Sequence, residues 1–112
     1  MDDRELLERA AKAAGLLYSP EHGCCFDDEH EQGRDWDPLR YDGDAMRLAV
    51  KLKIIVTFAD GGAGPHVCAG QRLGPFSNEK LPVKTLALNE ELAATRRAIV
   101  RAAAEIGLRN GG

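Results

Sequence analysis

Two His-x-Cys pairs have the residue types and spacing most specific for chemistry in this chain. They are His22-Gly23-Cys24 and His66-Val67-Cys68. Side chains two residues apart on a strand point to one face, so two such strands side by side would present a Cys2His2 set suited to zinc. The pattern lacks a C-x-x-C knuckle, and Gly23 falls where a turn is expected. The sequence therefore predicts either a zinc site formed by these four side chains, or small buried cysteines with histidines at loop margins.

Other catalytic patterns are missing from the sequence. A Cys/His nucleophile pair would need a base held by a third group and an oxyanion hole, and no motif indicates either. Neither G-x-S-x-G nor H-E-x-x-H occurs. The glycine-rich segment 60–65 matches no phosphate-binding fingerprint and precedes a strand. We therefore expect a protein that is not an enzyme and uses no cofactor.

Charge is distributed unevenly along the chain. Residues 1–44 carry 13 acidic and 5 basic side chains, a net charge of −8, whereas residues 45–112 carry 5 acidic and 10 basic ones, a net charge of +5. The two halves either neutralise each other in the fold or present opposite faces to a partner. Candidate partner-binding residues on the second view are Arg97, Arg101, Asp27, Asp28 and Glu29.

The acidic segment 27–35 has no apolar residue and is expected to be a mobile surface loop. Its acids lack the ligand spacing of a calcium-binding loop. A basic stripe for nucleic acid is the opposite alternative; it would consist of Arg47, Lys51, Lys53, Arg96, Arg97 and Arg101. The overall charge of −3 and the 5% aromatic content argue against that function.

The elements that must position these residues begin with a helix. Asp2 is expected to cap it, with Glu5 three residues later, and Gly15 to end it. Residues 16–18 and 24–26 are predicted to form a short pair of strands around a turn. Residues 54–58 are apolar on both faces, which predicts an interior strand paired in a hairpin with residues 66–69.

The segment 35–52 is expected to be the centre of the fold. Pro38 forces a turn, Asp42 can cap the following helix, and Trp36 is expected to fill volume in the core rather than to stack on a ligand. Met46 and Val50 widen the apolar surface of this helix, so we expect other elements to cover it on more than one side.

The last third of the chain is predicted to contain a loop and a helix. Breakers in residues 70–84 indicate a loop, and residues 84–88 are a candidate edge strand. Asn89 is expected to cap the final helix and Gly107 to end it. Arg96 falls at the margin of the buried face, where it can reach a carboxylate of the acidic half.

Length and composition suit one domain spanning residues 1–112, because the chain is long enough to bury a core. No apolar run approaches the length of a membrane span, and the acidic N-terminus is unlike a signal peptide. Three cysteines do not make a disulfide framework. We therefore expect a cytoplasmic protein without membrane contact.

A family resemblance rests on two segments, residues 36–52 and 93–107. The first reads Trp-Asp-Pro-Leu followed by Asp-Gly-Asp-Ala-Met-Arg-Leu-Ala-Val-Lys-Leu, and the second reads Ala-Ala-Thr-Arg-Arg-Ala-Ile-Val-Arg-Ala-Ala-Ala-Glu-Ile-Gly. Through them the chain resembles small phage and prophage proteins with the phage ABA sandwich domain. The resemblance implies a sheet sandwiched between helices, a phage or prophage origin, and no catalytic residues.

These observations predict an α+β fold in which an antiparallel β-sheet is sandwiched between α-helices. The predicted function is that of a phage- or prophage-encoded accessory protein that binds a protein partner of host or phage origin, or itself, in the bacterial host cell. The alternative is a small regulator that binds a metal or nucleic acid.

Overall fold

The structure is a computed structural model of the 112-residue chain. It describes residues 2–19, 24–27, 30–61, 64–72, 74, 76–81 and 88–111. The helices are α1 (Asp3–Ala13), α2 (Asp42–Leu52) and α3 (Leu88–Gly111). The strands are β1 (Leu17–Ser19), β2 (Cys24–Asp27), β3 (His30–Asp35), β4 (Ile55–Gly61), β5 (Gly64–Gly70) and β6 (Phe76–Lys80). None of the helices in the described part is both long and apolar enough to cross a membrane.

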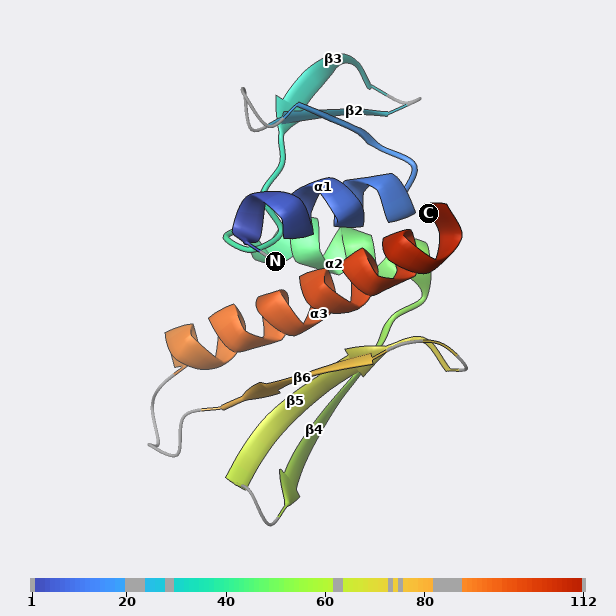
Figure 1. The fold of residues 1–112 in the computed structure, drawn as a ribbon. Coiled ribbons are helices and arrows are strands. Elements are labelled where there is room, and N and C mark those ends of the chain that lie inside the picture. Colours follow the sequence, from blue (N-terminus) through green and yellow to red (C-terminus); the bar gives the residue numbers. More distant parts are fainter. Residues whose placement is uncertain are drawn as a thin grey trace.

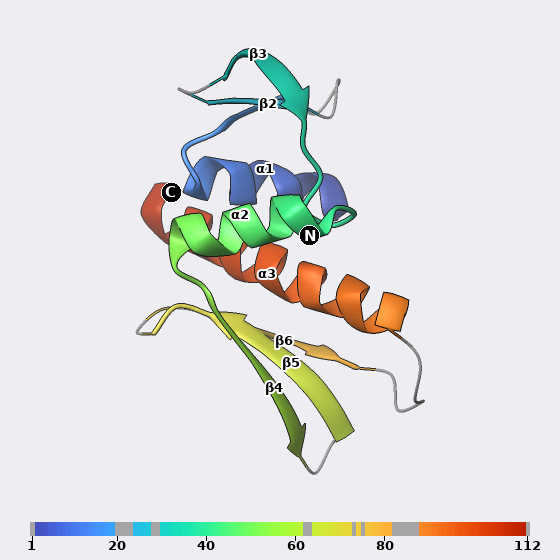
Figure 2. The same cartoon turned by 180° about the vertical axis from the view of Figure 1, so that it is seen from behind.

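The α+β class is confirmed, with an antiparallel sheet on which helices pack. One three-stranded sheet has the order β1-β2-β3 and the other has the order β4-β5-β6, and all pairs are antiparallel. The helices form the layer between the two sheets, in place of a sheet between helices (Figures 1 and 2). α3 packs on β5 and β6 with one side and on α1 and α2 with the others, so α3 is the central element.

Local sequence signals place α1 and the first pair of strands as expected. Asp2 is the N-cap, and its carboxylate accepts a hydrogen bond from the Glu5 N–H (2.9 Å). Gly15 follows the C-cap residue with φ +75°, a left-handed conformation that suits glycine. β1 pairs with β2 in the register Leu17↔Phe26. The predicted strand pair is therefore confirmed.

The contact between α1 and α3 depends on small side chains. Ala10, Ala11 and Ala103 are at most 1% exposed. Gly107 faces α1 so closely that a Cβ atom there would overlap the carbonyl oxygen of Arg9 and touch Ala13 Cβ (3.5 Å). Gly107 was expected to end the helix, but α3 continues to Gly111. Gly107 instead allows α1 and α3 to approach each other closely. A glycine near the end of a helical pattern is compatible with this role and with a C-terminal cap, and the sequence alone does not distinguish them.

The turn before α2 is held by Asp44, which is only 6% exposed. Its carboxylate accepts from the Asp37 N–H (3.0 Å) and from Arg47 Nη1 (3.1 Å). Trp36 is 2% exposed and meets the ring of Tyr18 edge to face with centroids 5.5 Å apart, so its predicted role as a core residue is confirmed. The predicted cap at Asp42 is wrong, because Tyr41 is the N-cap residue and no side-chain hydrogen bond caps α2 there.

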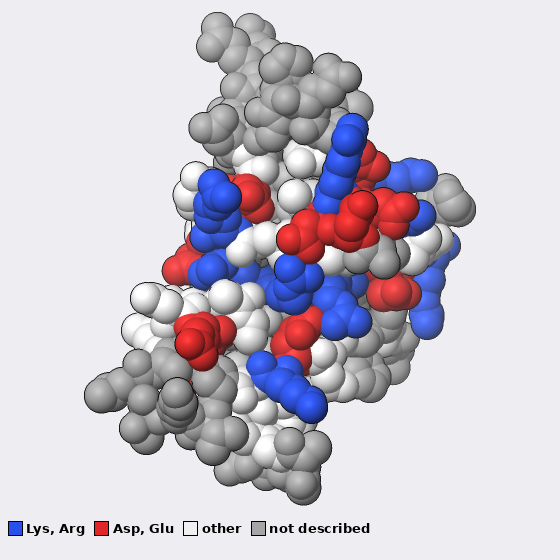
Figure 3. All heavy atoms as spheres, turned by 60° about the vertical axis from the view of Figure 1, so that its left-hand side comes forward, with Lys and Arg blue, Asp and Glu red and all other residues white. Residues whose placement is uncertain are grey.

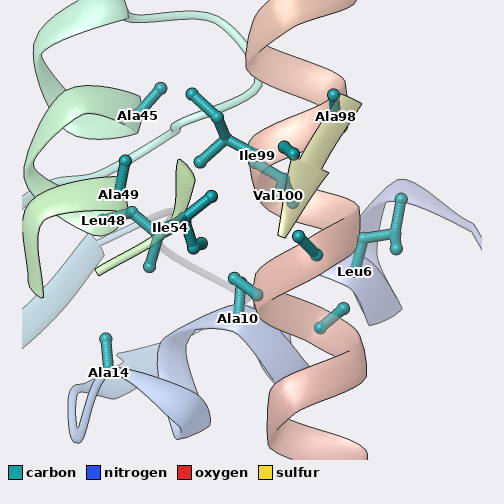
Figure 4. Close-up of a cluster of buried hydrophobic side chains, with 14 of the residues drawn as sticks. Leu6, Ala10, Ala14, Ala45, Leu48, Ala49, Ile54, Ala98, Ile99 and Val100 are labelled. Carbon is teal, nitrogen blue, oxygen red and sulfur yellow. The ribbon is translucent and has the colours of Figure 1, made fainter. Parts of the chain in front are cut away.

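α2 is a peripheral helix rather than the centre of the fold. Ala45, Leu48 and Ala49 are buried, and Figure 4 shows Ile99 extending from α3 toward this face. The opposite face carries Met46 at 64% and Val50 at 57% exposure. The prediction that this helix is covered on more than one side was therefore wrong, because the helix layer packs on one face of α2 only.

Three strand predictions are corrected by the pairing. Residues 30–35, expected in a mobile loop, form β3 and pair with β2, since backbone pairing at a sheet edge does not require apolar side chains. Residues 76–80 lie in a segment expected to be a loop, yet form β6, where Ser77 is buried and donates to the Ala98 carbonyl (2.6 Å). The segment 54–58 was expected to be interior, but β4 is an edge strand.

Two predictions concern the segment before α3. Residues 84–87 of the candidate edge strand lie outside the described residues. Asn89 was expected to be the N-cap residue, but α3 begins at Leu88, so Asn89 lies in its first turn. Helix ends predicted from capping residues alone commonly shift by one or two positions.

Replacing Gly107 by alanine should lower the free energy of unfolding by about 1–3 kcal/mol, because the new Cβ would overlap the Arg9 carbonyl and push α1 from α3. Chemical denaturation measures the change. The matched control is Gly43→Ala in α2, where the methyl would meet only the flexible end of Arg47. There the same substitution should leave stability unchanged or raise it by about 0.5–1 kcal/mol. Equal losses in the two variants would contradict the close contact.

Asp44→Asn should destabilise the protein by about 1–3 kcal/mol, because it removes the charge that holds Arg47 and one acceptor at a buried site. Asp42→Asn is the control, since the Asp42 side chain is 62% exposed and its loss should cost under about 1 kcal/mol. Urea unfolding of both variants provides the comparison. A larger loss for Asp42→Asn would show that the buried acceptor does not organise the turn.

Candidate functional site: the free edge of β4

The free edge of β4 is the most distinctive surface in the described part of the chain. β4 pairs with β5 along its whole length, from Ile55↔Gly70 to Gly61↔Gly64, without a register shift. No element of the described residues lies beside its other edge (Figure 2). Antiparallel strands direct alternate backbone N–H and C=O groups to either side, so half of the β4 groups have no strand partner. Such an edge can accept another strand.

Exposed apolar side chains accompany this edge. Phe58 is 61% exposed and Ile55 is 53% exposed, on opposite faces of β4. The large apolar side chains that are exposed among the described residues are Tyr41, Met46, Val50, Ile55, Phe58 and Leu88. All but Leu88 belong to the stretch 41–58 that forms α2 and β4. Two of the six, Ile55 and Phe58, therefore lie on β4 itself.

α3 leaves this part of the sheet uncovered. Pairing places Phe58 opposite Val67 and Val56 opposite Ala69, so these four residues share the face that α3 packs on. Val67 and Ala69 on β5 are fully buried. Phe58 remains exposed because α3 crosses β5 and β6, while β4 diverges from the helix (Figure 1). The sheet therefore has an apolar face that extends beyond its helix cover.

The predicted zinc ligands are divided between the two sheets. Cys24 lies on β2, whereas His66 and Cys68 lie on β5, on the other side of the helix layer (Figure 1). His22 lies outside the described residues. The two strands that would have to lie side by side therefore belong to different sheets. The spacing of the four residues contains no information on strand order, so the sequence did not reveal this separation.

His66 and Cys68 do share one face of β5, as the alternation of a strand requires. His66 Nδ1 donates to the Gly64 carbonyl (3.2 Å), and Cys68 Sγ donates to Asn78 Oδ1 (2.5 Å). Their neighbours across the strand pairs are Ala59, Lys80, Thr57 and Asn78. Nowhere in the described part do three His, Cys, Asp or Glu side chains converge. These two residues thus have structural hydrogen bonds and no third ligand among the described neighbours.

The arginines predicted to bind a partner form ion pairs within the chain. Arg97 Nη2 lies 3.0 Å from Asp3 Oδ1, and Arg101 Nη1 lies 2.6 Å from Glu79 Oε1. Both arginine side chains remain 41–48% exposed, so each pair is at the surface. Of the acidic residues predicted to act with them, Asp27 lies on β2 and Asp28 and Glu29 lie outside the described residues. The structure does not bring these two groups together in its described part.

Arg96 confirms the prediction of an ion pair with the acidic half. Its Nη1 lies 2.6 Å from Asp42 Oδ1, its Nε donates to the Leu39 carbonyl (2.9 Å), and its side chain is only 17% exposed. Together with the Arg97–Asp3 pair, it shows the two halves of the chain neutralising each other where they meet. Figure 3 shows the result, with basic and acidic side chains interspersed over the helix layer.

The basic stripe considered for nucleic acid is largely neutralised by the same pairing. Four of its six members contact carboxylates: Arg47, Arg96, Arg97 and Arg101. A surface that holds phosphates needs cations free to replace counterions. The interspersed charges of Figure 3 do not supply a face of one sign in that view.

Sequence reasoning missed the two residues that mark the edge of β4. Ile55 and Phe58 belong to a run that is apolar on both faces, and that pattern was interpreted as an interior strand. The same pattern fits an exposed edge strand, because an apolar run along one strand carries no information on which strands lie beside it. The distinguishing signal is the strand order, which becomes visible only when β5 is seen to pair with both β4 and β6.

Comparisons with family models, curated proteins and solved structures found no match to this chain. The resemblance to phage ABA sandwich proteins therefore stays a prediction.

Zinc content tests the first prediction from the sequence. We expect protein purified without added metal to contain far less than one zinc per chain by elemental analysis, because β2 and β5 lie in separate sheets. His66→Ala is the matched control and should leave the zinc content unchanged. A ratio near one that falls in this variant would establish a metal site and contradict the structural reading.

Proposed function

We propose that this protein is a non-enzymatic protein-binding module that binds its partner through the free edge of β4. The observation that carries the proposal is a seven-residue edge strand with an exposed aromatic side chain at its centre, Phe58. Strand addition to a sheet edge is a common mode of recognition, in which main-chain hydrogen bonds provide affinity and alternate side chains provide specificity.

Within the described part of the chain, the edge of β4 has none of the features that keep natural sheet edges from pairing. Folded proteins protect such edges with lysines, prolines, bulges, very short strands or a covering element. β4 has no lysine or proline, its register is regular, and its only charged residue is Asp60 near the end. β6 at the opposite edge is shorter, carries Glu79 and Lys80, and packs under α3. The contrast within one sheet supports a partner at β4 and none at β6.

Four described residues of types used in catalysis have partners within the fold. Asp42, Asp44 and Glu79 each contact an arginine, and Cys68 bonds to Asn78. The alternative of a nucleic-acid-binding regulator is weakened by the paired arginines, and that of a metal-binding regulator by the separation of β2 from β5. A phage or prophage origin belongs to the proposal only through the sequence resemblance.

Capture of partners by tagged protein from lysate of the source cells tests the proposal. Partners bound through the β4 edge should remain after a wash with roughly 0.5 M salt, because this concentration screens surface charge but leaves backbone pairing and apolar contact intact. Phe58→Lys should lose them, since it replaces the exposed aromatic side chain at the centre of the edge by a charged one.

Thr57→Lys is the matched control, because it introduces the same charge one residue away on the opposite face of the sheet. A partner that is retained by Thr57→Lys and lost by Phe58→Lys supports the proposal. The proposal fails if the captured proteins are the same for both variants, or if wild-type protein binds neither another protein nor itself.

A further inference from the structure

We infer that the occupant of the β4 edge is a second copy of this chain, added antiparallel across a twofold axis at Phe58. This inference rests on the proposed function and names its partner. The sheet would then run continuously in the order β6-β5-β4-β4-β5-β6. Most homo-oligomers have such closed twofold symmetry, in which the same patch serves both subunits.

The backbone of β4 determines which residues can pair outward. Gly61 and Gly64 pair across a two-residue connection, and the closing pair of such a hairpin exchanges hydrogen bonds. Because hydrogen-bonded and non-bonded pairs alternate, Ile55, Thr57 and Ala59 also direct their N–H and C=O groups toward β5. Val56, Phe58 and Asp60 direct theirs toward the free edge. A second strand must satisfy these three residues.

One symmetric register satisfies all of them. When the twofold axis passes through the Phe58 pair, Phe58 exchanges hydrogen bonds with its own counterpart, and Val56 does so with the second copy's Asp60. This register also overlaps the full strand, with Ile55 opposite Gly61 and Thr57 opposite Ala59. Moving the axis by one residue, to Thr57, pairs Asp60 with Ile54, which lies outside β4 and is buried. The register centred on Phe58 is therefore the one that fits the length of the strand.

The side chains agree with this register. The two Phe58 rings would lie side by side on the face of the sheet that α3 packs on, beyond the part that α3 covers, and directly opposite aromatic residues stabilise antiparallel pairs. Burial between two copies would account for a phenylalanine that is 61% exposed in one copy. The strand's single charge lies opposite Val56, so no like charges meet across the pair. A twofold axis perpendicular to the sheet would place both helix layers on one face, with the Phe58 pair between them.

The first measurement is the solution mass of the wild-type chain by sedimentation equilibrium from about 1 to 100 μM, because the monomer mass is 12.2 kDa. We expect a dimer whose dissociation constant rises by more than roughly 30-fold in Phe58→Lys, since that substitution removes two central aromatic contacts and opposes two lysines. Thr57→Lys, which faces Ala59 of the second copy and not itself, should retain the dimer. Circular dichroism and thermal unfolding confirm that both variants are folded.

A charge exchange tests the register itself. Phe58→Glu alone should be as monomeric as Phe58→Lys, whereas an equimolar mixture of the two should form a heterodimer, because only a Phe58-to-Phe58 pair places the opposite charges together. A wild-type monomer at about 100 μM, or a dimer that Phe58→Lys leaves intact, overturns the inference. In the first case the capture experiment still decides the proposed function, because a different protein retained by Thr57→Lys and lost by Phe58→Lys would support edge binding without self-association.

Discussion

The close contact between α1 and α3 is the constraint on which the rest of the structure depends. Gly107 lets the backbone of α1 approach so closely that no side chain fits between them. Alanines on both helices complete the contact, and their small size brings two helices together with little loss of side-chain entropy. α3 is thereby fixed with one side against helices and another against β5 and β6. The second sheet therefore packs on α3, whereas the first sheet meets the helix layer through α1.

The turn around Asp44 links the acidic half of the chain to this helix layer. Asp44 closes the turn internally, while Arg96 on α3 contacts Asp42 and the Leu39 carbonyl from outside. Asp44 holds one end of this turn and Arg96 holds the other. The direction of α2 is therefore fixed, although other elements cover only one of its sides. Met46 and Val50 are exposed on the face of α2 that other elements do not cover. The uneven charge of the sequence is thus used for internal pairing between the two halves.

The two edges of the sheet β4-β5-β6 differ in length, charge and cover. β6 is short, charged and covered by α3, whereas β4 is long, regular and apolar at its centre. Since an unprotected edge exposes a protein to uncontrolled pairing, its retention beside a protected one supports a defined partner there. The exposed Phe58 would give such a partner an apolar contact in addition to backbone hydrogen bonds.

Patterns confined to neighbouring residues were predicted well from the sequence. The Asp2 cap, the Gly15 stop, the first strand pair, the hairpin 54–69 and the buried Trp36 all follow from local backbone conformation and alternation, which act over a few residues. The pairing of Arg96 also followed, because its position on the helix margin limits what it can reach.

Only the tertiary structure decided which elements are neighbours. Strand order made β4 an edge and separated Cys24 from His66, and helix crossing made Gly107 a contact rather than a stop. These outcomes depend on packing between segments far apart in the chain, and the same local pattern is compatible with several such arrangements. The sequence by itself therefore determined the elements and the fold class. The tertiary structure decided that α3 packs on β5 and β6 and that one edge of β4 stays free, and this edge forms the candidate site.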